Sequence, residues 1–295
     1  MSEVSIRPMR PEDATAAERL SGDAFLALDR RIMRRDQPAP EPRSDEHRRG
    51  WVERTRHLVA TDPGGCWVAD AGGEMVGFAT SVRREGTWIL ATYAVRPELQ
   101  GRGLGKQVLD AALTHSRGCL RGMLSSSADP KAVRRYLLSG FTMHPQMYLT
   151  GVVDRSAIPV EVGAKVREGT AADTDLMDSV DRACRGSGHG PDHPMMQRIW
   201  RWVVSESTTG SGYAYLTPGG AVALLAATNR RTAQRLLWAA IADGPEEQRI
   251  SHVTAANAWA IEVATSARLD LHTAGYLGLR GMRPPTNYLH SGALL

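Results

Sequence analysis

The 295-residue chain is poor in cysteine and contains no long apolar run. Its three cysteines, Cys66, Cys119 and Cys184, are odd in number and widely spaced. This argues against a disulfide framework or a zinc site and favours free thiols in a reducing compartment. No segment is long enough to span a bilayer, and the N-terminus lacks a signal-peptide core. We therefore expect a cytoplasmic protein with no membrane partner.

The chain also lacks a large excess of charge of either sign, because its formal net charge is only +4. A balance this close to neutral argues against a nucleic-acid partner. It fits an anionic small molecule, and it fits a simply solvated surface equally well. The length is sufficient for two domains, each with its own core.

One stretch combines an apolar run, a glycine-rich segment and a helical pattern. Residues 87–95 are apolar, β-branched and aromatic, which predicts a strand, and Leu104 and Val108 begin a helical spacing. Between them lies Gln100-Gly101-Arg102-Gly103-Leu104-Gly105, followed by Lys106. Glycines allow a close approach of the backbone to a ligand, and the first amides of a helix attract anions. The stretch predicts a phosphate or pyrophosphate cradle. The alternative is an ordinary strand-to-helix turn.

A second segment, residues 129–141, predicts a short capped helix. Asp129 suits the N-cap, Pro130 the first helical position and Gly140 the position after the end. Tyr136 lies inside this helix, either as a functional residue or as a core tyrosine of an amphipathic helix.

In this order and spacing, the two segments resemble motifs A and B of the GCN5-related N-acetyltransferases (GNAT). The resemblance implies that the glycine loop binds the pyrophosphate of acetyl-CoA. It also implies that an amide near Ala94 and Val95 stabilises the oxyanion, and that Tyr136 is the general acid. No metal is expected. The implied cofactor-binding residues are Ala94, Val95, Gln100, Gly101, Arg102, Gly103, Leu104, Gly105, Lys106 and Asp129.

The chain also contains a weak internal repeat, because residues 166–173 parallel residues 6–13. We predict an α/β (α+β) protein of two tandem GNAT-like domains, each a mixed, mostly antiparallel sheet flanked by helices. Residues 1–150 would form the catalytic domain, 151–160 a linker, and 161–295 a degenerate domain without a glycine loop. This tandem arrangement resembles mycothiol synthase and the enhanced-intracellular-survival acetyltransferases.

The resemblance implies an acetyl-CoA-dependent N-acetyltransferase that acts directly on a primary amine of a small molecule, as a monomer or homodimer. The strand at residues 87–95 has no Asp or Glu to serve as the base. A water chain, His47, His57, a residue of the second half or the Leu295 carboxylate remain candidates. Two alternatives stay open: a non-catalytic acyl-CoA-binding or regulatory module, and an acyltransferase that uses another acyl-CoA or a peptide N-terminus.

Three further patterns admit two interpretations each. The helix expected over residues 45–60 is rich in cations, which favours a carboxylate or phosphate on the acceptor or else marks a solvated face. Residues 188–194 bring together His189, Asp192 and His193, but a metal site needs a third convergent ligand, so a capped loop is favoured. The tail 287–295 is apolar, which predicts a docked strand. Helical patterns place four tryptophans in the core: Trp200, Trp202, Trp238 and Trp259.

Overall fold

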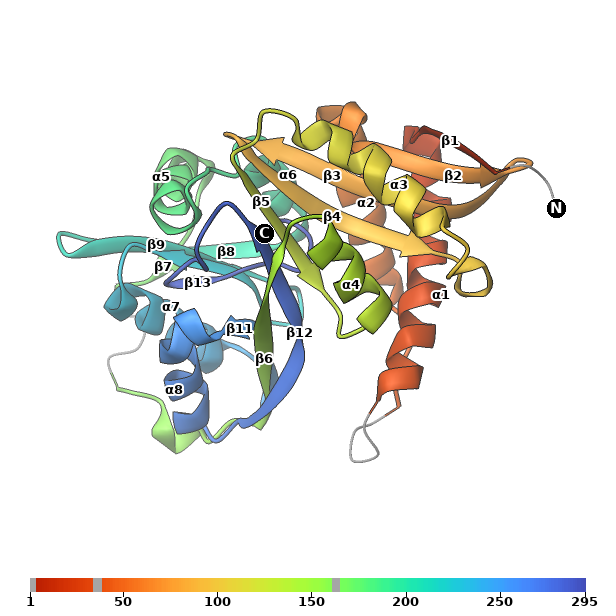
Figure 1. The fold of residues 1–295 in the computed structure, drawn as a ribbon. Helices are drawn as coiled ribbons and strands as arrows, with labels where there is room; N and C mark the ends of the chain where they lie inside the picture. Colours follow the sequence, from red (N-terminus) through yellow and green to blue (C-terminus); the bar gives the residue numbers. More distant parts are fainter. Residues whose placement is uncertain (1–3, 34–38, 161–164) are drawn as a thin grey trace. The chain divides into compact units, whose positions relative to one another are not determined.

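The computed structural model describes residues 4–33, 39–160 and 165–295 (Figure 1). It divides into two compact units, Met1–Leu120 and Arg121–Leu295. Each unit combines helices with antiparallel strand pairs, so the predicted α/β class is confirmed. In the part of the chain that the structure describes, no helix has the length and apolar character needed to cross a membrane.

The first unit is a four-stranded antiparallel sheet with helices on both faces (Figure 1). The strand order is β1 (Val4–Pro8), β2 (Cys66–Ala71), β3 (Glu74–Arg84) and β4 (Thr87–Val95). Helices α1 (Ala14–Ile32) and α2 (Asp45–Thr61) cover one face, and α3 (Leu104–Leu113) covers the other. Strands β3 and β4 are buried almost throughout, because a sheet covered on both faces has no solvated side.

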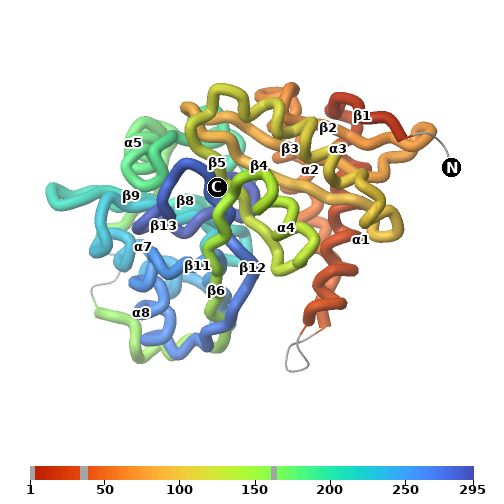
Figure 2. Tube along the Cα trace, in the orientation of Figure 1, coloured from red at the N-terminus to blue at the C-terminus, as the bar shows by residue number. Residues whose placement is uncertain are grey.

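The second unit contains two sheets. One has the order β5 (Arg121–Ser126), β12 (Asp270–Arg280), β6 (Thr142–Val152) and β11 (Glu247–Thr254), and β6 and β12 run side by side in Figure 2. The other has the order β13 (Tyr288–Leu289), β10 (Val222–Ala227), β9 (Gly210–Leu216), β8 (Arg201–Ser207) and β7 (Arg167–Glu168).

Five helices complete the second unit: α4 (Pro130–Leu138), α5 (Thr174–Arg185), α6 (Asp192–Ile199), α7 (Arg230–Asp243) and α8 (Ala258–Ser266) among the described residues. A continuous core joins its parts, with Leu149 of β6, Leu225 of β10, Leu236 of α7 and Trp259 of α8 all buried in it. Single 3₁₀ turns occur at Pro11–Asp13, Pro63–Gly65, Pro97–Leu99, Thr114–Ser116, Arg155–Ala157, Ala171–Asp173 and Ala255–Asn257.

The structure corrects the assignment of two tryptophans. Trp202 lies in strand β8, and Trp200 has extended backbone where α6 ends. The helical interpretation is wrong because residues 201–207 contain two adjacent β-branched valines, Val203 and Val204, which favour a strand. Trp238 and Trp259 do lie in helices, α7 and α8, and both pack with the core of the second unit.

The compact units and the predicted domains divide the chain at different places. The units separate after Leu120, so β5, α4 and β6 belong with the C-terminal residues. The predicted linker 151–160 begins inside β6, which ends at Val152, and continues through a 3₁₀ turn. The predicted domains are defined by the repeat in the sequence, whereas the compact units are defined by packing. The division into domains 1–150 and 161–295 stays a prediction.

Candidate active site

The glycine loop connects strand β4 to helix α3, as the sequence predicts. Gly101 and Gly103 both have a φ of 85°, a conformation that side-chain-bearing residues resist. A Cβ at either position would meet no atom within 4 Å, so the space beside both glycines is open. Glycine is needed at these two positions for the backbone conformation, and residues 101–103 are exposed.

The start of α3 presents unused amides to this loop. The amides of Lys106 and Gln107 donate to the Gly103 carbonyl at 3.0 and 3.3 Å. The amides of Leu104 and Gly105 precede these donors and point out of the helix end. Gly103 is the N-cap and has no side chain that could accept from them. The positive end of the helix dipole therefore faces open space, which is a suitable place for a phosphate.

Gly105 has a different role from the other two glycines. A Cβ at Gly105 would overlap the hydroxyl of Tyr93, which lies in β4. The glycine thus allows α3 to pack tightly against the strand. The sequence motif groups Gly105 with the ligand-facing glycines. The motif cannot separate them, because the contact between Gly105 and Tyr93 depends on how α3 packs on β4.

Backbone pairing decides which amide at the end of β4 is available. Arg96 N donates to Val76 O of β3 at 2.9 Å. Because hydrogen-bonded positions alternate along an antiparallel pair, the amide of Ala94 faces β3 and that of Val95 faces away from it. The Gln100 side chain donates to the Val95 carbonyl at 3.1 Å, on this same edge. Of the two predicted residues, Val95 carries the amide that faces away from β3, and its contact with a ligand stays a prediction.

The Lys106 side chain is directed along its own helix. Its ammonium forms an exposed ion pair with Asp110, one helical turn away. Such a pair contributes little to stability. Lys106 adds positive charge near the loop, as expected, but part of that charge is offset locally.

A second group of polar residues lies between α1, α2 and β4. The Arg54 guanidinium stacks over Trp51 at 5.3 Å and approaches the Thr92 hydroxyl at 3.5 Å. Its Nε is buried and has no hydrogen-bond partner among the described residues. Burial, and then the nearby Arg43, lower the pKa of Arg54 to about 10, so it stays charged at neutral pH. Arg43 itself pairs with Glu18 at 3.1 Å.

The cations of α2 therefore fall into two sets. Arg48, Arg49 and Arg56 are exposed, as on a solvated helix face, whereas Arg54 turns inward. Desolvation, together with the charges of Arg43 and Arg54, lowers the pKa of His47. His47 is consequently neutral near pH 7 and able to accept a proton.

The residues of the second predicted motif lie on α4, in the second unit. The Asp129 carboxylate accepts from the Lys131 amide at 3.0 Å, so Asp129 caps the helix as expected. Tyr136 is 5% exposed. The predicted helix end is also observed, since Gly140 has a φ of 84°. Whether Asp129 and Tyr136 contact a ligand stays a prediction.

The C-terminal tail docks as a strand. Residues 288–289 form β13, which pairs with β10, and Leu294 and Leu295 are fully buried. Sequence reasoning also missed one cluster in this unit, formed by Asp178, Asp181, His189 and His193. The sequence spacing suggests Asp192 as the acidic neighbour of the two histidines, because it reveals neither α6 nor the face of α5 that carries Asp178 and Asp181.

The arrangement is that of an α/β protein in which a glycine loop leaves a helix N-terminus uncapped beside open space. Residues 30–141 match the family model described as the acetyltransferase (GNAT) family. The match covers well under half of the chain, and the fold of the chain is similar to that of a tandem GNAT protein.

One sequence relative also matches part of the chain. A mycothiol acetyltransferase of Streptomyces avermitilis is 40% identical over 88 residues, which are 28% of this chain and 29% of that protein. The match thus spans less than a third of the length of this curated relative.

The solved structures match the fold over nearly the whole chain. A provisionally described acetyltransferase of Pyrococcus horikoshii has a TM-score of 0.72 at 19% identity, over 99% of this chain and 95% of that one. A tandem GNAT protein from the clavulanic acid biosynthesis pathway has a TM-score of 0.59 at 15% identity, over 94% and 98% of the two chains.

Proposed function

We propose that the chain is an acetyl-CoA-dependent N-acetyltransferase that acts on a primary amine of a small molecule. One observation carries this proposal: the glycine loop between β4 and α3, with two glycines at φ 85° and uncapped helix amides beside open space. The family match over residues 30–141 supports it. The 40% identity to a mycothiol acetyltransferase over 88 residues adds a relative that is named for acetyl transfer.

In this proposal, the loop residues Gln100–Lys106 hold the pyrophosphate of acetyl-CoA, and acetyl-CoA supplies the acetyl group. The amine attacks the thioester carbon, a C–N bond forms and the C–S bond breaks. The Val95 amide would stabilise the negative charge on the carbonyl oxygen, because it points away from β3. Tyr136 would protonate the departing thiolate, and neutral His47 is the candidate acceptor for the proton of the amine.

The acceptor is proposed to carry a carboxylate or another anionic group. Arg54 supports this, because its buried, charged guanidinium has an Nε without a partner in the described chain. A buried donor of this kind gains about 1.5–3 kcal/mol from a charge-assisted hydrogen bond. The cytoplasmic location and the monomeric or homodimeric state stay predictions.

The test combines calorimetry with a turnover screen. Titration of the full chain with acetyl-CoA is expected to show a single binding site per chain. Gly103→Trp should abolish binding by filling the cradle. Gly73→Trp is the matched control, because Gly73 also has a positive φ (91°) and open space around it, in the β2–β3 turn. Turnover of primary amines is followed by release of the CoA thiol and by the mass of the product.

Each outcome discriminates between the candidate functions. Acetylation of small amines, lost in Gly103→Trp and kept in Gly73→Trp, supports the proposal. Binding without turnover of any amine would identify an acyl-CoA-binding module instead. Turnover only with a longer acyl-CoA, or only at a peptide N-terminus, would identify the second alternative. Absence of binding to the native chain overturns the proposal.

A further inference from the structure

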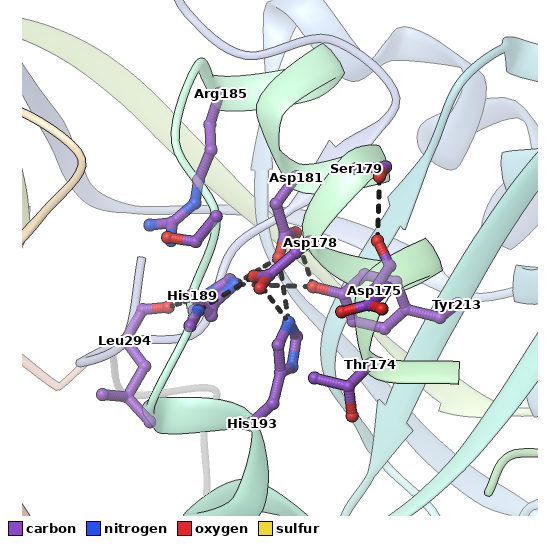
Figure 3. A network of polar contacts seen from close by, with 12 residues as sticks. Thr174, Asp175, Asp178, Ser179, Asp181, Arg185, His189, His193, Tyr213 and Leu294 are labelled. Atoms are coloured by element: carbon purple, nitrogen blue, oxygen red, sulfur yellow. Dashed lines mark hydrogen bonds and ion pairs between the residues drawn. The ribbon is translucent and has the colours of Figure 1, made fainter. Parts of the chain in front are cut away.

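Three ionisable side chains of the second unit, Asp181, His189 and His193, converge on one point, and Asp178 lies beside them (Figure 3). Asp178 and Asp181 lie three residues apart and share a face of α5. His189 lies in the loop that follows, and His193 lies in the first turn of α6. Asp181 and both histidines have side chains that are 0% exposed, and the Asp178 side chain is 13% exposed. No step of the proposed reaction uses these residues.

The hydrogen bonds of His189 leave its second nitrogen facing a carboxylate. Its Nε2 lies 2.8 Å from the Leu294 carbonyl oxygen, which only accepts, so Nε2 carries a hydrogen. Its Nδ1 lies 2.7 Å from Asp181 Oδ2. With the hydrogen on Nε2, a neutral His189 ring has a lone pair at Nδ1. This lone pair and one on Asp181 Oδ2 would repel each other at 2.7 Å, so a positive charge must lie between the two atoms. That charge is either a proton or a metal ion.

His193 directs a buried nitrogen into the same space. Its Nδ1 lies 3.0 Å from the Tyr215 hydroxyl oxygen. Its Nε2 is buried without a hydrogen-bond partner in the described residues, at 3.3 Å from Asp181 Oδ2 and 3.4 Å from Asp178 Oδ1. Tyr213 donates to the other oxygen, Asp181 Oδ1, at 2.5 Å. Asp181 Oδ2 is thereby left directed at the two imidazoles.

We propose that Asp178, Asp181, His189 and His193 bind a divalent metal ion, and that zinc is the ion that fits them best. Tetrahedral zinc with nitrogen and oxygen ligands at about 2.0–2.2 Å places neighbouring ligand atoms about 3.3–3.5 Å apart. The separations of 3.3 and 3.4 Å around His193 Nε2 agree with this. The 2.7 Å separation at His189 would widen as an ion takes its place there.

The surrounding contacts are those that support metal ligands. A ligating histidine usually uses its other ring nitrogen to bind a carbonyl or another fixed polar group, which fixes its orientation. Leu294 O and the Tyr215 hydroxyl occupy these places for His189 and His193. Imidazole and carboxylate ligands suit zinc, and two carboxylates neutralise a divalent ion. Arg185 lies close by, and its Nη2 donates to the Gly188 carbonyl at 3.0 Å.

A site with four protein ligands and almost no exposure is a closed, structural site. It would join α5, the following loop and α6, and it would hold the C-terminal tail through the bond from His189 to Leu294. The sequence analysis expected no metal because it had found no third convergent ligand. Asp181 is such a ligand. Asp178 lies 3.4 Å from His193 Nε2 and would move towards the other two ligands to become the fourth.

The experiment uses the full chain in native form and as His193→Gln. His290→Gln is the matched control, because His290 is also a buried histidine of the second unit but contacts Gln146. Metal content is measured after purification, and the chain is then dialysed against a chelator. Zinc chloride is added back while the thermal midpoint is followed. Cobalt(II) is added separately, because its visible absorption reports tetrahedral coordination.

We expect the native chain and His290→Gln to bind zinc stoichiometrically, to show tetrahedral cobalt absorption and to melt higher with zinc. His193→Gln should lose all three properties. Absence of metal, cobalt absorption and a zinc-dependent midpoint in the native chain would overturn the proposal, leaving a cluster held by protons. Equal metal binding by His193→Gln would also overturn it. If that variant fails to fold, Asp178→Asn, at the partly exposed ligand, decides by the same measurements.

Discussion

The substitution Gly103→Ala isolates the backbone contribution of the glycine loop. A Cβ at this position meets no atom within 4 Å, so the methyl group itself causes no clash. The cost comes from φ 85° and ψ −13°, because a side-chain-bearing residue in the left-handed region is about 1–2 kcal/mol less favourable than glycine. The effect of Gly103→Ala therefore measures how strongly ligand binding depends on this conformation.

The expected magnitude depends on when the strain is incurred. If the loop of the variant relaxes in the free protein, it must return to φ 85° to bind acetyl-CoA, and the Kd rises about 5–30-fold for 1–2 kcal/mol. If the folded unit holds the loop rigid, the same 1–2 kcal/mol is lost from the free energy of unfolding instead. The losses in binding and in folding together should amount to about 1–2 kcal/mol.

The assay is calorimetric titration with acetyl-CoA, paired with denaturant unfolding. Gly86→Ala is the matched control: Gly86 has a φ of 77°, open space around it and a position in the β3–β4 turn of the same unit. It should lower stability by a similar amount and leave the Kd unchanged. The reasoning is refuted if Gly86→Ala weakens binding as much as Gly103→Ala, or if Gly103→Ala changes neither quantity.

Three further predictions concern catalysis, acceptor recognition and stability. Tyr136→Phe should lower kcat by about 10²–10⁴-fold without changing the calorimetric Kd of acetyl-CoA, and equal losses in both would contradict its role as general acid. Arg54→Gln should raise the KM of an amine that carries a carboxylate by about 10–100-fold but not that of an uncharged amine, as steady-state kinetics would show. Asp62→Asn should lower the free energy of unfolding at pH 7 by about 3–5 kcal/mol, because it removes the negative charge that lies 2.8 Å from the buried Arg84 guanidinium. Burial raises the pKa of Asp62, but the hydrogen bond from His115 and the charge of Arg84 outweigh burial and hold this pKa below its usual value. The stabilisation is therefore fully present above the unfolded pKa of about 4 and is lost progressively as the pH falls from there towards the lower folded pKa. Denaturant unfolding from pH 7 to pH 3 should narrow the difference between the two proteins without closing it.

The sequence predicts the local elements well where the signal is local. Strand β4, the glycine loop and α3 follow from an apolar run, three glycines and a helical spacing, and α4 follows from Asp129, Pro130 and Gly140. Short-range signals of this kind do not depend on distant partners. Helix α6 and strand β8 escaped detection because eight- and seven-residue segments offer little periodicity, and the tryptophans at 200 and 202 suggested the wrong period.

The parts of the site that escaped prediction all depend on tertiary packing. Gly105 approaches Tyr93 only because α3 lies across β4. Arg54 belongs to a helix full of cations, and only the fold separates the inward guanidinium from the exposed ones. The grouping of Asp181 with His189 requires that α5 turn one particular face toward the following loop. Sequence spacing gives candidates for such sites, and packing selects among them.

The start of α7 supports the prediction that the second half has no phosphate cradle. This helix follows strand β10, much as α3 follows β4, but its N-cap is Asn229. The Asn229 side chain accepts from the Thr232 amide at 2.9 Å and donates to the Thr209 carbonyl at 2.8 Å. A side chain therefore occupies the helix end that α3 leaves open at Gly103. An anion that binds at the start of α7 would have to displace this cap, which contributes about 0.5–2 kcal/mol to stability. The amides that are free at the start of α3 are thus already hydrogen-bonded within the protein at the start of α7.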